Sequence, residues 1–408
     1  MKNINKILIL VFLCLVETIS FAQYSCTGGR FFNETFTVAI ASDIIYGSAK
    51  TVSGSTQTLK LDIYTPVGDT STKRPLLIFG HGGSFISGTK ADGDVVALCN
   101  RFAKRGYVCV SYDYRLGIGL PIDQAHASKA VFRATQDAKA VVRFFKKDAQ
   151  TTNTYKVDPG YVYLGGSSAG AFIALHYAYL DQEPEIPAYL DTVGLGPIEG
   201  SSGNPGFNSD ISAVINLCGA LGSVNWMHAG DEPVCSMHGT IDQVVPYATA
   251  LLLISGTFPI MVVDGSHTVD SMATVLSLDH VFHTWIGADH VPYASSTTYM
   301  DSTVEFVRDF LCTQLGKAPL PGTLVQPIQQ TVNNIKIYPT VSSSEIIIEK
   351  STDEKILVEI TDVTGRVLKK LVINDRLIPV SRDNISNGLY LLTISGKNFR
   401  ETEKIVFY

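Results

Sequence analysis

Charge is scarce and evenly spread along this sequence. Asp, Glu, Lys and Arg make up 17% of the 408 residues, the formal net charge is −6, and no long cluster of Lys and Arg occurs. Nucleic acids and anionic membrane surfaces bind clustered positive charge, so neither is expected as a partner. The apolar fraction of 45% is ordinary for a globular protein. The length exceeds that of one ordinary domain and suggests two.

Metal-binding spacings are missing as well. The sequence contains no Cys-x-x-Cys and no His-x-x-x-His spacing that would suggest a metal site. No other cofactor is expected either. Only one apolar run is long enough to concern a membrane. It spans Ile7–Val16, follows Lys2 and Lys6, and precedes small residues that end at Ala22. It is shorter than the roughly 20 residues that a bilayer crossing needs, so residues 1–22 are predicted to be a secretory signal peptide rather than an anchor.

Export makes disulfides possible in the mature chain. Six cysteines remain after the signal peptide, and six allow 15 connectivities among which the sequence does not choose. Three of them fall in apolar, strand-like runs and are interpreted as buried thiols. The six are Cys26, Cys99, Cys109, Cys218, Cys235 and Cys312, of which Cys109, Cys218 and Cys235 are the three in apolar runs.

Residues 23–315 alternate between strand-like and helical patterns. A helix between two of the strand-like runs carries apolar residues at spacings of three and four, which predicts one buried stripe. Several apolar runs lack polar alternation and are therefore expected to be covered on both faces. The prediction is an α/β fold with a mostly parallel sheet flanked by helices. The helical stripe is Val131, Ala134, Ala138, Val141 and Phe145.

The pattern changes near residue 316. Residues 316–332 contain three prolines and no periodicity, which predicts a linker. Residues 333–408 contain only short alternating strands and turns, such as Ile346–Glu349 and "GLYLLTI" at 388–394. This tail is predicted to be a small all-β sandwich domain.

A strand that ends in Gly-x-Ser-x-Gly and turns directly into a helix holds its central serine on a tight elbow. Here the motif is Gly166-Ser167-Ser168-Ala169-Gly170, between an apolar strand and an alanine-rich helical pattern. The elbow projects the serine hydroxyl from the carboxyl end of the sheet, and the glycines avoid collisions with neighbouring elements. The pattern predicts Ser168 as a nucleophile.

A second glycine-rich turn, "IFGHGGSF", follows an earlier apolar strand. Such a turn presents backbone N–H groups to the oxyanion that forms when a serine attacks a carbonyl. We predict Gly83 and Ser84 as oxyanion donors, with Ala169 as the third. His81 is interpreted as a structural residue of the turn, and a plain strand-to-loop turn remains the alternative.

A nucleophilic serine needs an imidazole base and a carboxylate that orients it, and in the elbow fold these follow in the order Ser, Asp or Glu, His. Asp242 in "HGTIDQVVPY" and His290 in "GADHVPY" each lie just beyond a strand. They are predicted to complete a Ser-His-Asp triad. A turn-capping role for Asp242 stays open. The other candidates are His267, His280 and His283 as base and Asp289 as acid.

Taken together, "GHGGSF", "YDYRLG", "DAKAVVRFF", "GGSSAG", "HGTIDQVVPY" and "GADHVPY" resemble the α/β-hydrolase fold carboxylesterases. The likeness is greatest to the secreted branch with acetyl-xylan and feruloyl esterases, and it covers roughly residues 35–315. The resemblance implies Ser168 as nucleophile, Asp242 as acid and His290 as base. Ser84 stands where many of these esterases have a third glycine, which leaves backbone donation intact.

The tail resembles the type IX secretion sorting domain in "IKIYP", "VEITDVTGRVL", "SNGLYLLTI" and "KIVFY". Thr340-Val341 departs from the Asn-Pro that is usual in that family. The resemblance implies the type IX secretion machinery as a partner, export across both membranes, and a location outside the cell or on its surface. A carbohydrate-binding or spacer module is the alternative.

The sequence therefore predicts a secreted serine carboxylesterase that acts through an acyl-enzyme on acetyl or feruloyl esters of polysaccharides or on related small esters. The alternatives are a peptidase of the same fold and a catalytically inactive surface-binding protein. The irregular stretch at 181–210 is interpreted either as a partial lid over the pocket or as a surface excursion.

Overall fold

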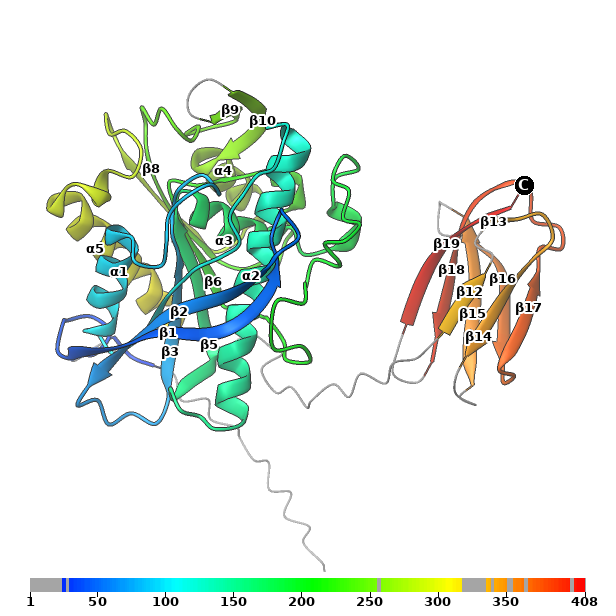
Figure 1. Cartoon of the computed structure of the whole chain (residues 1–408), viewed down its shortest axis with the longest axis horizontal. Coiled ribbons are helices and arrows are strands. Elements are labelled where there is room, and N and C mark those ends of the chain that lie inside the picture. Colours follow the sequence, from blue (N-terminus) through cyan, green and yellow to red (C-terminus); the bar gives the residue numbers. More distant parts are fainter. Residues whose placement is uncertain are drawn as a thin grey trace, which may run out of the picture. The chain divides into compact units, whose positions relative to one another are not determined.

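The computed structural model divides the chain into two compact units, one up to Pro327 and one from Ile328 (Figure 1). The predicted signal peptide and residues 318–332 of the predicted linker lie outside the described residues. Among the described residues, none of the helices combines the length and the apolar character that a bilayer crossing needs. The structure describes residues 24–26, 29–254, 258–317, 335–338, 341–350, 355–362, 366–396 and 400–407.

The first unit is built on an eight-stranded sheet in the order β1-β2-β4-β3-β5-β6-β8-β11. From β4 onward in that order, neighbouring strands pair in parallel, whereas β1 and β2 form an antiparallel edge. This confirms the predicted mostly parallel sheet. The strands are β1 (Thr37–Lys50), β2 (Thr56–Val67), β3 (Arg74–Gly80), β4 (Val108–Tyr112), β5 (Val157–Ser167), β6 (Ala213–Leu217), β8 (Val234–Gly239) and β11 (His280–Trp285).

Helices cover both faces of this sheet. In β3, Leu76 and Ile78 pack into the core beneath α2, α3 and α4, whereas Leu77 and Phe79 pack into the core beneath α1 and α5. Both sets are fully buried, which explains why the strand lacks polar alternation. The helices are α1 (Gly93–Ala103), α2 (Gln124–Gln150), α3 (Ala169–Tyr179), α4 (Ser266–Leu276) and α5 (Thr297–Leu315), with short 3₁₀ turns η1 (Glu183–Glu185), η2 (Val224–Trp226) and η3 (Pro292–Ala294).

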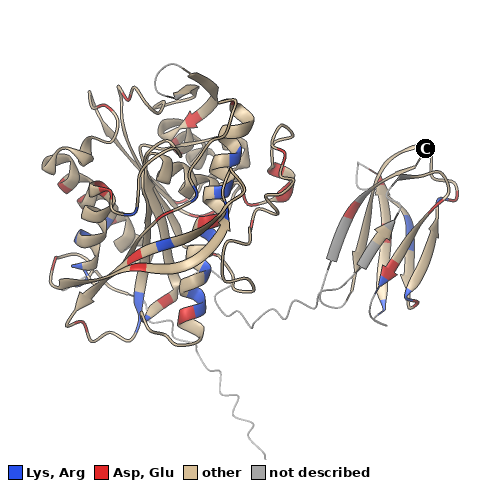
Figure 2. Ribbon diagram, in the orientation of Figure 1, with Lys and Arg blue, Asp and Glu red and all other residues tan. Residues whose placement is uncertain are grey.

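The α2 helix is buried on more than the predicted stripe. Its Lys and Arg residues (Figure 2) include Arg143, which is only 2% exposed and donates to the backbone oxygens of Glu199 (2.7 Å) and Gly203 (2.9 Å). Gln136 likewise donates to the carbonyl oxygens of Leu195 and Pro197. The stretch Asp181–Asp210 is therefore fixed against a polar face of α2 that the apolar spacing did not reveal.

A small second sheet, in the order β7-β10-β9, was not predicted. Its strands β9 and β10 form an antiparallel hairpin, and β7 pairs with the far end of β10. The strands are β7 (Ala220–Leu221), β9 (Ala250–Ile254) and β10 (Phe258–Gly265).

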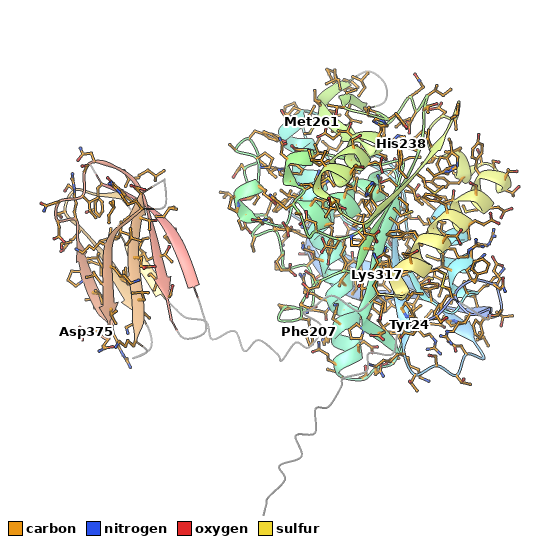
Figure 3. The ribbon with its side chains drawn as sticks, turned by 180° about the vertical axis from the view of Figure 1, so that it is seen from behind. Tyr24, Phe207, His238, Met261, Lys317 and Asp375 are labelled. Carbon is orange, nitrogen blue, oxygen red and sulfur yellow. A yellow bond between two sulfur atoms is a disulfide. The ribbon has the colours of Figure 1, made fainter. Side chains whose placement is uncertain are left out.

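The two ends of the first unit meet. A disulfide joins Cys26 to Cys312 across 286 residues, and the Tyr24 ring contacts Tyr161, whose hydroxyl donates to the Lys317 carbonyl. Figure 3 shows Tyr24 in the lower part of the unit, on the side away from Met261. The remaining described cysteines, Cys99, Cys109, Cys218 and Cys235, are buried free thiols.

The second unit consists of a three-stranded sheet, β12-β14-β17, and a five-stranded sheet, β13-β19-β18-β15-β16. Inward residues such as Ile348, Val358 and Leu392 form one apolar core. The strands are β12 (Ile335–Tyr338), β13 (Val341–Ser342), β14 (Glu345–Lys350), β15 (Ile356–Asp362), β16 (Val367–Ile373), β17 (Leu377–Ser381), β18 (Gly388–Ser395) and β19 (Arg400–Phe407).

Candidate active site

Ser168 occupies a strained elbow between β5 and α3, with φ 54° and ψ −114°. The flanking glycines are required because neighbouring backbone atoms lie where their Cβ atoms would be. A Cβ on Gly166 would lie 2.2 Å from the Gly170 carbonyl carbon, and a Cβ on Gly170 would lie 2.1 Å from the Gly80 oxygen. Strain of this kind costs on the order of 1–3 kcal/mol and persists only where the surroundings enforce it.

Hydrogen bonds to neighbouring elements fix the elbow in place. The Ser168 N–H donates to the Leu217 carbonyl at 2.9 Å, which ties the elbow to the neighbouring strand β6. The preceding Ser167 hydroxyl lies 2.8 Å from the Tyr293 hydroxyl, and both are buried. The elbow is therefore held from two sides while Ser168 remains 8% exposed.

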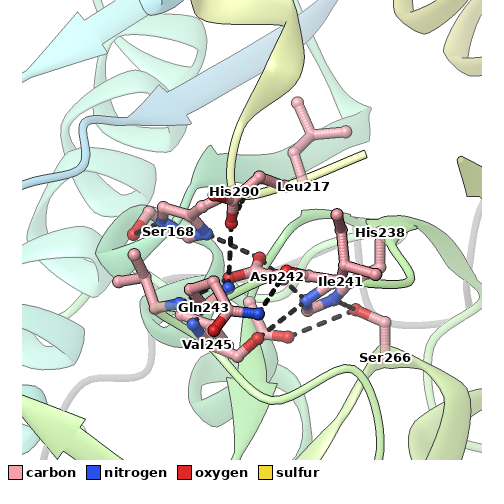
Figure 4. A network of polar contacts seen from close by, with 12 residues as sticks. Ser168, Leu217, His238, Ile241, Asp242, Gln243, Val245, Ser266 and His290 are labelled. Atoms are coloured by element: carbon pink, nitrogen blue, oxygen red, sulfur yellow. Dashed lines mark hydrogen bonds and ion pairs between the residues drawn. The ribbon is translucent and has the colours of Figure 1, made fainter. Parts of the chain in front are cut away.

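The structure brings the three predicted triad side chains together (Figure 4). His290 Nε2 lies 2.8 Å from Ser168 Oγ, and His290 Nδ1 lies 2.7 Å from Asp242 Oδ2. Asp242 follows β8 and His290 follows β11. Because β5, β8 and β11 run in the same direction, their carboxyl ends place the three residues on one edge of the sheet.

The Asp242 carboxylate receives four N–H groups. The backbone N–H groups of Val244 and Val245 each donate to Oδ1 at 2.8 Å, and His290 Nδ1 and His238 Nε2 lie 2.7 and 3.1 Å from Oδ2. Burial alone would raise the pKa of this carboxyl, but the hydrogen bonds from His238 and His290 outweigh it and hold the pKa well below its ordinary value. Asp242 is therefore ionised at neutral pH.

The glycine-rich turn lies against the nucleophile. Gly83 and Ser84 have φ of 102° and 54°, and a Cβ on Gly82 would lie 3.4 Å from the Ser168 Cβ. Within the described part of the chain, the N–H groups of Gly83, Ser84 and Ala169 donate to no protein acceptor. Ser84 and Ala169 line one pocket with Ser168, whereas Gly83 is absent from that lining. The arrangement leaves two N–H groups beside the nucleophile free to bind an oxyanion.

His81 lies in the same turn, and its side chain contacts Tyr114 and the turn itself. Its ring stacks on Tyr114 with centroids 4.2 Å apart, and its Nδ1 lies 2.7 Å from the Gly82 carbonyl oxygen. The Tyr114 hydroxyl in turn donates to the His81 carbonyl at 3.0 Å. These contacts give His81 a structural part in shaping the turn.

The other candidate acids and bases lie elsewhere. His280 contacts Thr274 and Asp270, and the ring of His283 contacts Phe306. The His267 ring packs on Tyr247 and Phe282. The Asp289 carboxylate accepts from the backbone N–H groups of Gln243 and His290, so it braces the loop and does not orient the imidazole ring.

A mostly apolar pocket opens beside Ser168. Four parts of the chain build most of it: the first half of α2, the α3 helix, the 181–210 segment and the β9–β10 hairpin. The glycine-rich turn, η2 and the loop after Asp242 contribute the remaining side chains, together with Ile118. The side chains that line it carry no formal charge apart from what a histidine could hold. They include Phe85, Val131, Phe132, Phe172, His176, Tyr189, Leu190, Trp226, Leu252, Ile260 and Met261.

The histidine in this wall is neutral. His176 Nδ1 bonds the Phe172 carbonyl at 2.8 Å, and Nε2 accepts the Gly222 N–H at 3.3 Å. Burial lowers the pKa of His176 to about 4. His176 therefore presents an uncharged ring beside Trp226, and the whole pocket suits an uncharged apolar group.

The 181–210 segment is a fixed wall of this pocket. It contributes Pro187, Tyr189, Leu190 and Ile198 to the lining. Leu190 and Ile198 also pack in a small apolar cluster with Phe132 and Leu180. Together with the Arg143 contacts to Glu199 and Gly203, these interactions hold the segment against α2, where it forms one side of the pocket.

In the described part of the chain, one group of three metal-ligating side chains converges, namely Cys218, Asp242 and His290. The ligand atoms of Asp242 and His290 already hydrogen bond to each other. Burial raises the pKa of the Cys218 thiol, so the thiol stays protonated. The group does not suit a cation.

Sequence reasoning missed the support behind Asp242. His238 is the penultimate residue of β8, four residues before Asp242, and is fully buried, with Ser266 and Asn216 behind it. The available signal was a histidine near the end of a buried strand, close in sequence to the predicted acid. The hairpin of the pocket was also missed, although its residues are rich in apolar side chains.

Two parts of the chain match known protein families. Residues 61–221 match the BD-FAE family, and residues 336–408 match the secretion system C-terminal sorting domain. The probable isoprenylcysteine alpha-carbonyl methylesterase ICME of Oryza sativa subsp. japonica is 35% identical over 115 residues. That match covers 28% of this chain and only 24% of the rice protein.

Solved structures of esterase 2 from Thermogutta terrifontis align with part of this chain. The apo form is 22% identical with a TM-score of 0.49, and the alignment covers 68% of this chain and 96% of the other. The form phosphorylated by paraoxon gives 22% identity and the same TM-score, with 69% and 96% covered.

The order of the parallel sheet and the match of residues 61–221 to the BD-FAE family agree with the α/β-hydrolase fold predicted from the sequence. The tail, residues 336–408, is a type IX secretion sorting domain, which directs the protein to the cell surface or the extracellular space. The predicted fold class and the predicted destination are thereby confirmed.

Proposed function

We propose that this protein is a serine carboxylesterase that uses Ser168, His290 and Asp242 as its catalytic triad. The observation that carries the proposal is the unbroken hydrogen-bonded series from Ser168 Oγ through the His290 ring to Asp242 Oδ2, with steps of 2.8 and 2.7 Å. This geometry favours an active enzyme over an inactive binding protein, because a decayed site has no reason to keep three aligned groups.

In the proposed mechanism, His290 Nε2 takes the proton of Ser168 as Oγ attacks the ester carbonyl carbon. The negative charge that develops on the carbonyl oxygen is stabilised by the N–H groups of Ala169 and Ser84, with Gly83 as a further predicted donor. Asp242 holds the Nδ1 proton of His290 and stabilises the imidazolium. His290 then protonates the departing alcohol.

Water resolves the acyl-enzyme by the same steps in reverse. His290 Nε2 takes a proton from the water as its oxygen attacks the acyl carbon, and Ser168 Oγ leaves with that proton. The cycle regenerates the free serine and releases a carboxylic acid. The steps need no metal and no cofactor.

The substrates that we propose are acetyl or feruloyl esters of polysaccharides, or related small esters, met outside the cell. Secretion places the enzyme where such esters occur. The apolar walls beside Ser168 support an aromatic or longer aliphatic group better than an acetyl group, because an acetyl group would leave most of the pocket lining uncovered.

The test compares the purified mature protein with its Ser168→Ala variant on p-nitrophenyl esters of rising chain length, methyl ferulate and acetylated xylan. Ser271→Ala is the matched control, because Ser271 is an exposed serine on α4 outside the site. We expect Ser168→Ala to lose at least about 10³-fold in kcat and Ser271→Ala to keep wild-type rates. Ester turnover by Ser168→Ala at the wild-type rate would contradict the proposal.

A further inference from the structure

A second imidazole lies behind the proposed catalytic carboxylate. His238, near the end of β8, is fully buried, and its Nε2 lies 3.1 Å from Asp242 Oδ2 and 3.1 Å from the Val245 carbonyl oxygen (Figure 4). Both neighbours are acceptors only. Nε2 must therefore carry a proton, because a bare nitrogen would repel both. His238 acts as a donor toward Asp242.

The other ring nitrogen of His238, Nδ1, hydrogen bonds to a buried series of polar side chains. His238 Nδ1 lies 2.7 Å from Ser266 Oγ, and Ser266 Oγ accepts from Asn216 Nδ2 at 2.9 Å. The Asn216 amide orientation is fixed because its Oδ1 accepts the Gly219 N–H at 2.9 Å. These donors and acceptors run in one direction, from Asn216 through Ser266 to His238.

Only one proton is available on the Ser266 hydroxyl. It has two possible acceptors, the Gly219 carbonyl at 3.2 Å and His238 Nδ1 at 2.7 Å. The shorter contact favours donation to Nδ1. His238 Nδ1 then accepts from Ser266, and the ring carries its proton on Nε2, directed at Asp242 and the Val245 carbonyl.

His238 supplies one of the four N–H groups that hydrogen bond to the Asp242 carboxylate. Oδ1 already receives the N–H groups of Val244 and Val245, so rotation of the carboxyl group is opposed on that side. Oδ2 receives His290 and His238 from two different directions. Without His238, Oδ2 would keep one donor and the carboxylate would be held less firmly in line with the His290 ring.

We propose that His238, supported by Ser266 and Asn216, is a positioning residue that holds the Asp242 carboxylate ionised and aligned with the His290 imidazole. This inference rests on the proposed function, since it assigns a role within the same triad. A buried histidine that only fills space would not need a fixed tautomer or a contact with the acid.

The pH dependence of kcat/KM distinguishes a positioning role of His238 from a purely space-filling role. The titratable groups that face the Asp242–His290 pair are His238 from β8, Cys218 from the end of β6 and Tyr293 from η3, and Asp289 stands beside His290 in the loop. Burial holds the pKa values of Cys218 and Tyr293 above their ordinary range, so both stay neutral in the assay. A change in the acid limb of kcat/KM on altering His238 then reports on Asp242 and His290.

The experiment compares His238→Leu and His238→Gln with wild type. His238→Leu removes the donor, so kcat should fall about 10- to 100-fold with KM within about 3-fold, and the acid limb should move to higher pH by about half a unit or more, because Asp242 then bears a less delocalised charge beside His290. The Gln side chain carries an N–H donor at a comparable reach. His238→Gln should therefore keep most of the wild-type kcat and most of the wild-type position of the acid limb.

Met237→Leu is the matched control, because Met237 is the neighbouring fully buried residue on β8 and its side chain packs in the opposite core. It should lower stability to urea without moving the pH profile. If His238→Leu keeps the wild-type kcat and acid limb, the inference is overturned. If Ser168→Ala remains active, the proposed function fails instead, and the two failures are distinguishable.

A measurement on the unaltered protein covers the case in which the buried variants do not fold. In ¹⁵N-labelled wild type, the His238 ring should show a protonated Nε2 and an unprotonated Nδ1 that accepts a hydrogen bond. A ring with its proton on Nδ1 alone would overturn the inference, because that tautomer cannot donate to Asp242.

Discussion

The apolar pocket gives the most quantitative prediction of substrate preference. If it holds the apolar part of the ester, kcat/KM should rise as that part grows, until the pocket is full. The perturbation is the addition of methylene groups, in a p-nitrophenyl ester series for the acyl side and in an alkyl acetate series for the alcohol side.

The magnitude follows from burial against side chains such as Phe132, Leu190 and Trp226. Each buried methylene contributes about 0.8 kcal/mol, which corresponds to roughly a 4-fold gain. Butyrate should therefore exceed acetate by about 15-fold in kcat/KM when both methylenes bind against the walls. Formally charged acyl groups, such as succinyl, should show no gain, because the pocket offers no counter-charge.

Filling the pocket by substitution tests whether the chain-length gain in kcat/KM arises there. Val131 lines the pocket from α2, and Val131→Trp should abolish most of the chain-length gain while acetate hydrolysis stays within a few-fold of wild type. Val275→Trp is the control, since Val275 is 76% exposed on α4 and absent from the lining. A flat profile in both ester series, or a wild-type profile in Val131→Trp, would show that the pocket does not hold the apolar part of the ester.

Three further outcomes follow from the contacts around the site and the termini. Asp242→Asn should lower kcat on the order of 10³- to 10⁴-fold with KM little changed, because His290 loses its orienting charge, and steady-state kinetics with equal kcat in the variant would contradict this. The Cys26–Cys312 disulfide closes a 286-residue loop, so Cys312→Ser should destabilise the first unit by roughly 3–5 kcal/mol and lower its Tm by about 10 °C, and an unchanged melting curve would count against it. The folded-state pKa of His176, about 4, lies below its unfolded value, so the unfolded chain binds more protons between these two pKa values. Stability should therefore fall by about 3 kcal/mol as pH drops from about 6.5 to 4, and urea unfolding of His176→Phe should show a flatter acid side than wild type.

The sheet and the elbow were predictable because their physics is local. Buried parallel strands appear as unbroken apolar runs, and the close approach at Gly166 and Gly170 permits no side chain. Asp242 and His290 were predictable as candidates because parallel strands deliver their carboxyl ends to one edge. The choice of His290 over His280 and His283 depended on which histidine follows its strand and which lies within it.

The pocket and the support behind Asp242 could not be predicted in the same way. The 181–210 segment has no periodicity, and its position is fixed by contacts to Arg143 and Gln136 that are remote in sequence. Likewise, the Cys26–Cys312 pairing depends on where the two ends of the unit meet. His238 resembles any core residue of a buried strand until its distance to Asp242 is known.

Whether Ser168 is the nucleophile can be tested most directly by treating the mature protein with a fluorophosphonate and locating the adduct by mass spectrometry of its peptides. We expect a single adduct on Ser168 and loss of esterase activity in proportion to labelling. The His290→Ala variant should be labelled more slowly, because the serine then lacks its base. An adduct on another residue, or full activity with Ser168 modified, would contradict the assignment of Ser168 as the nucleophile.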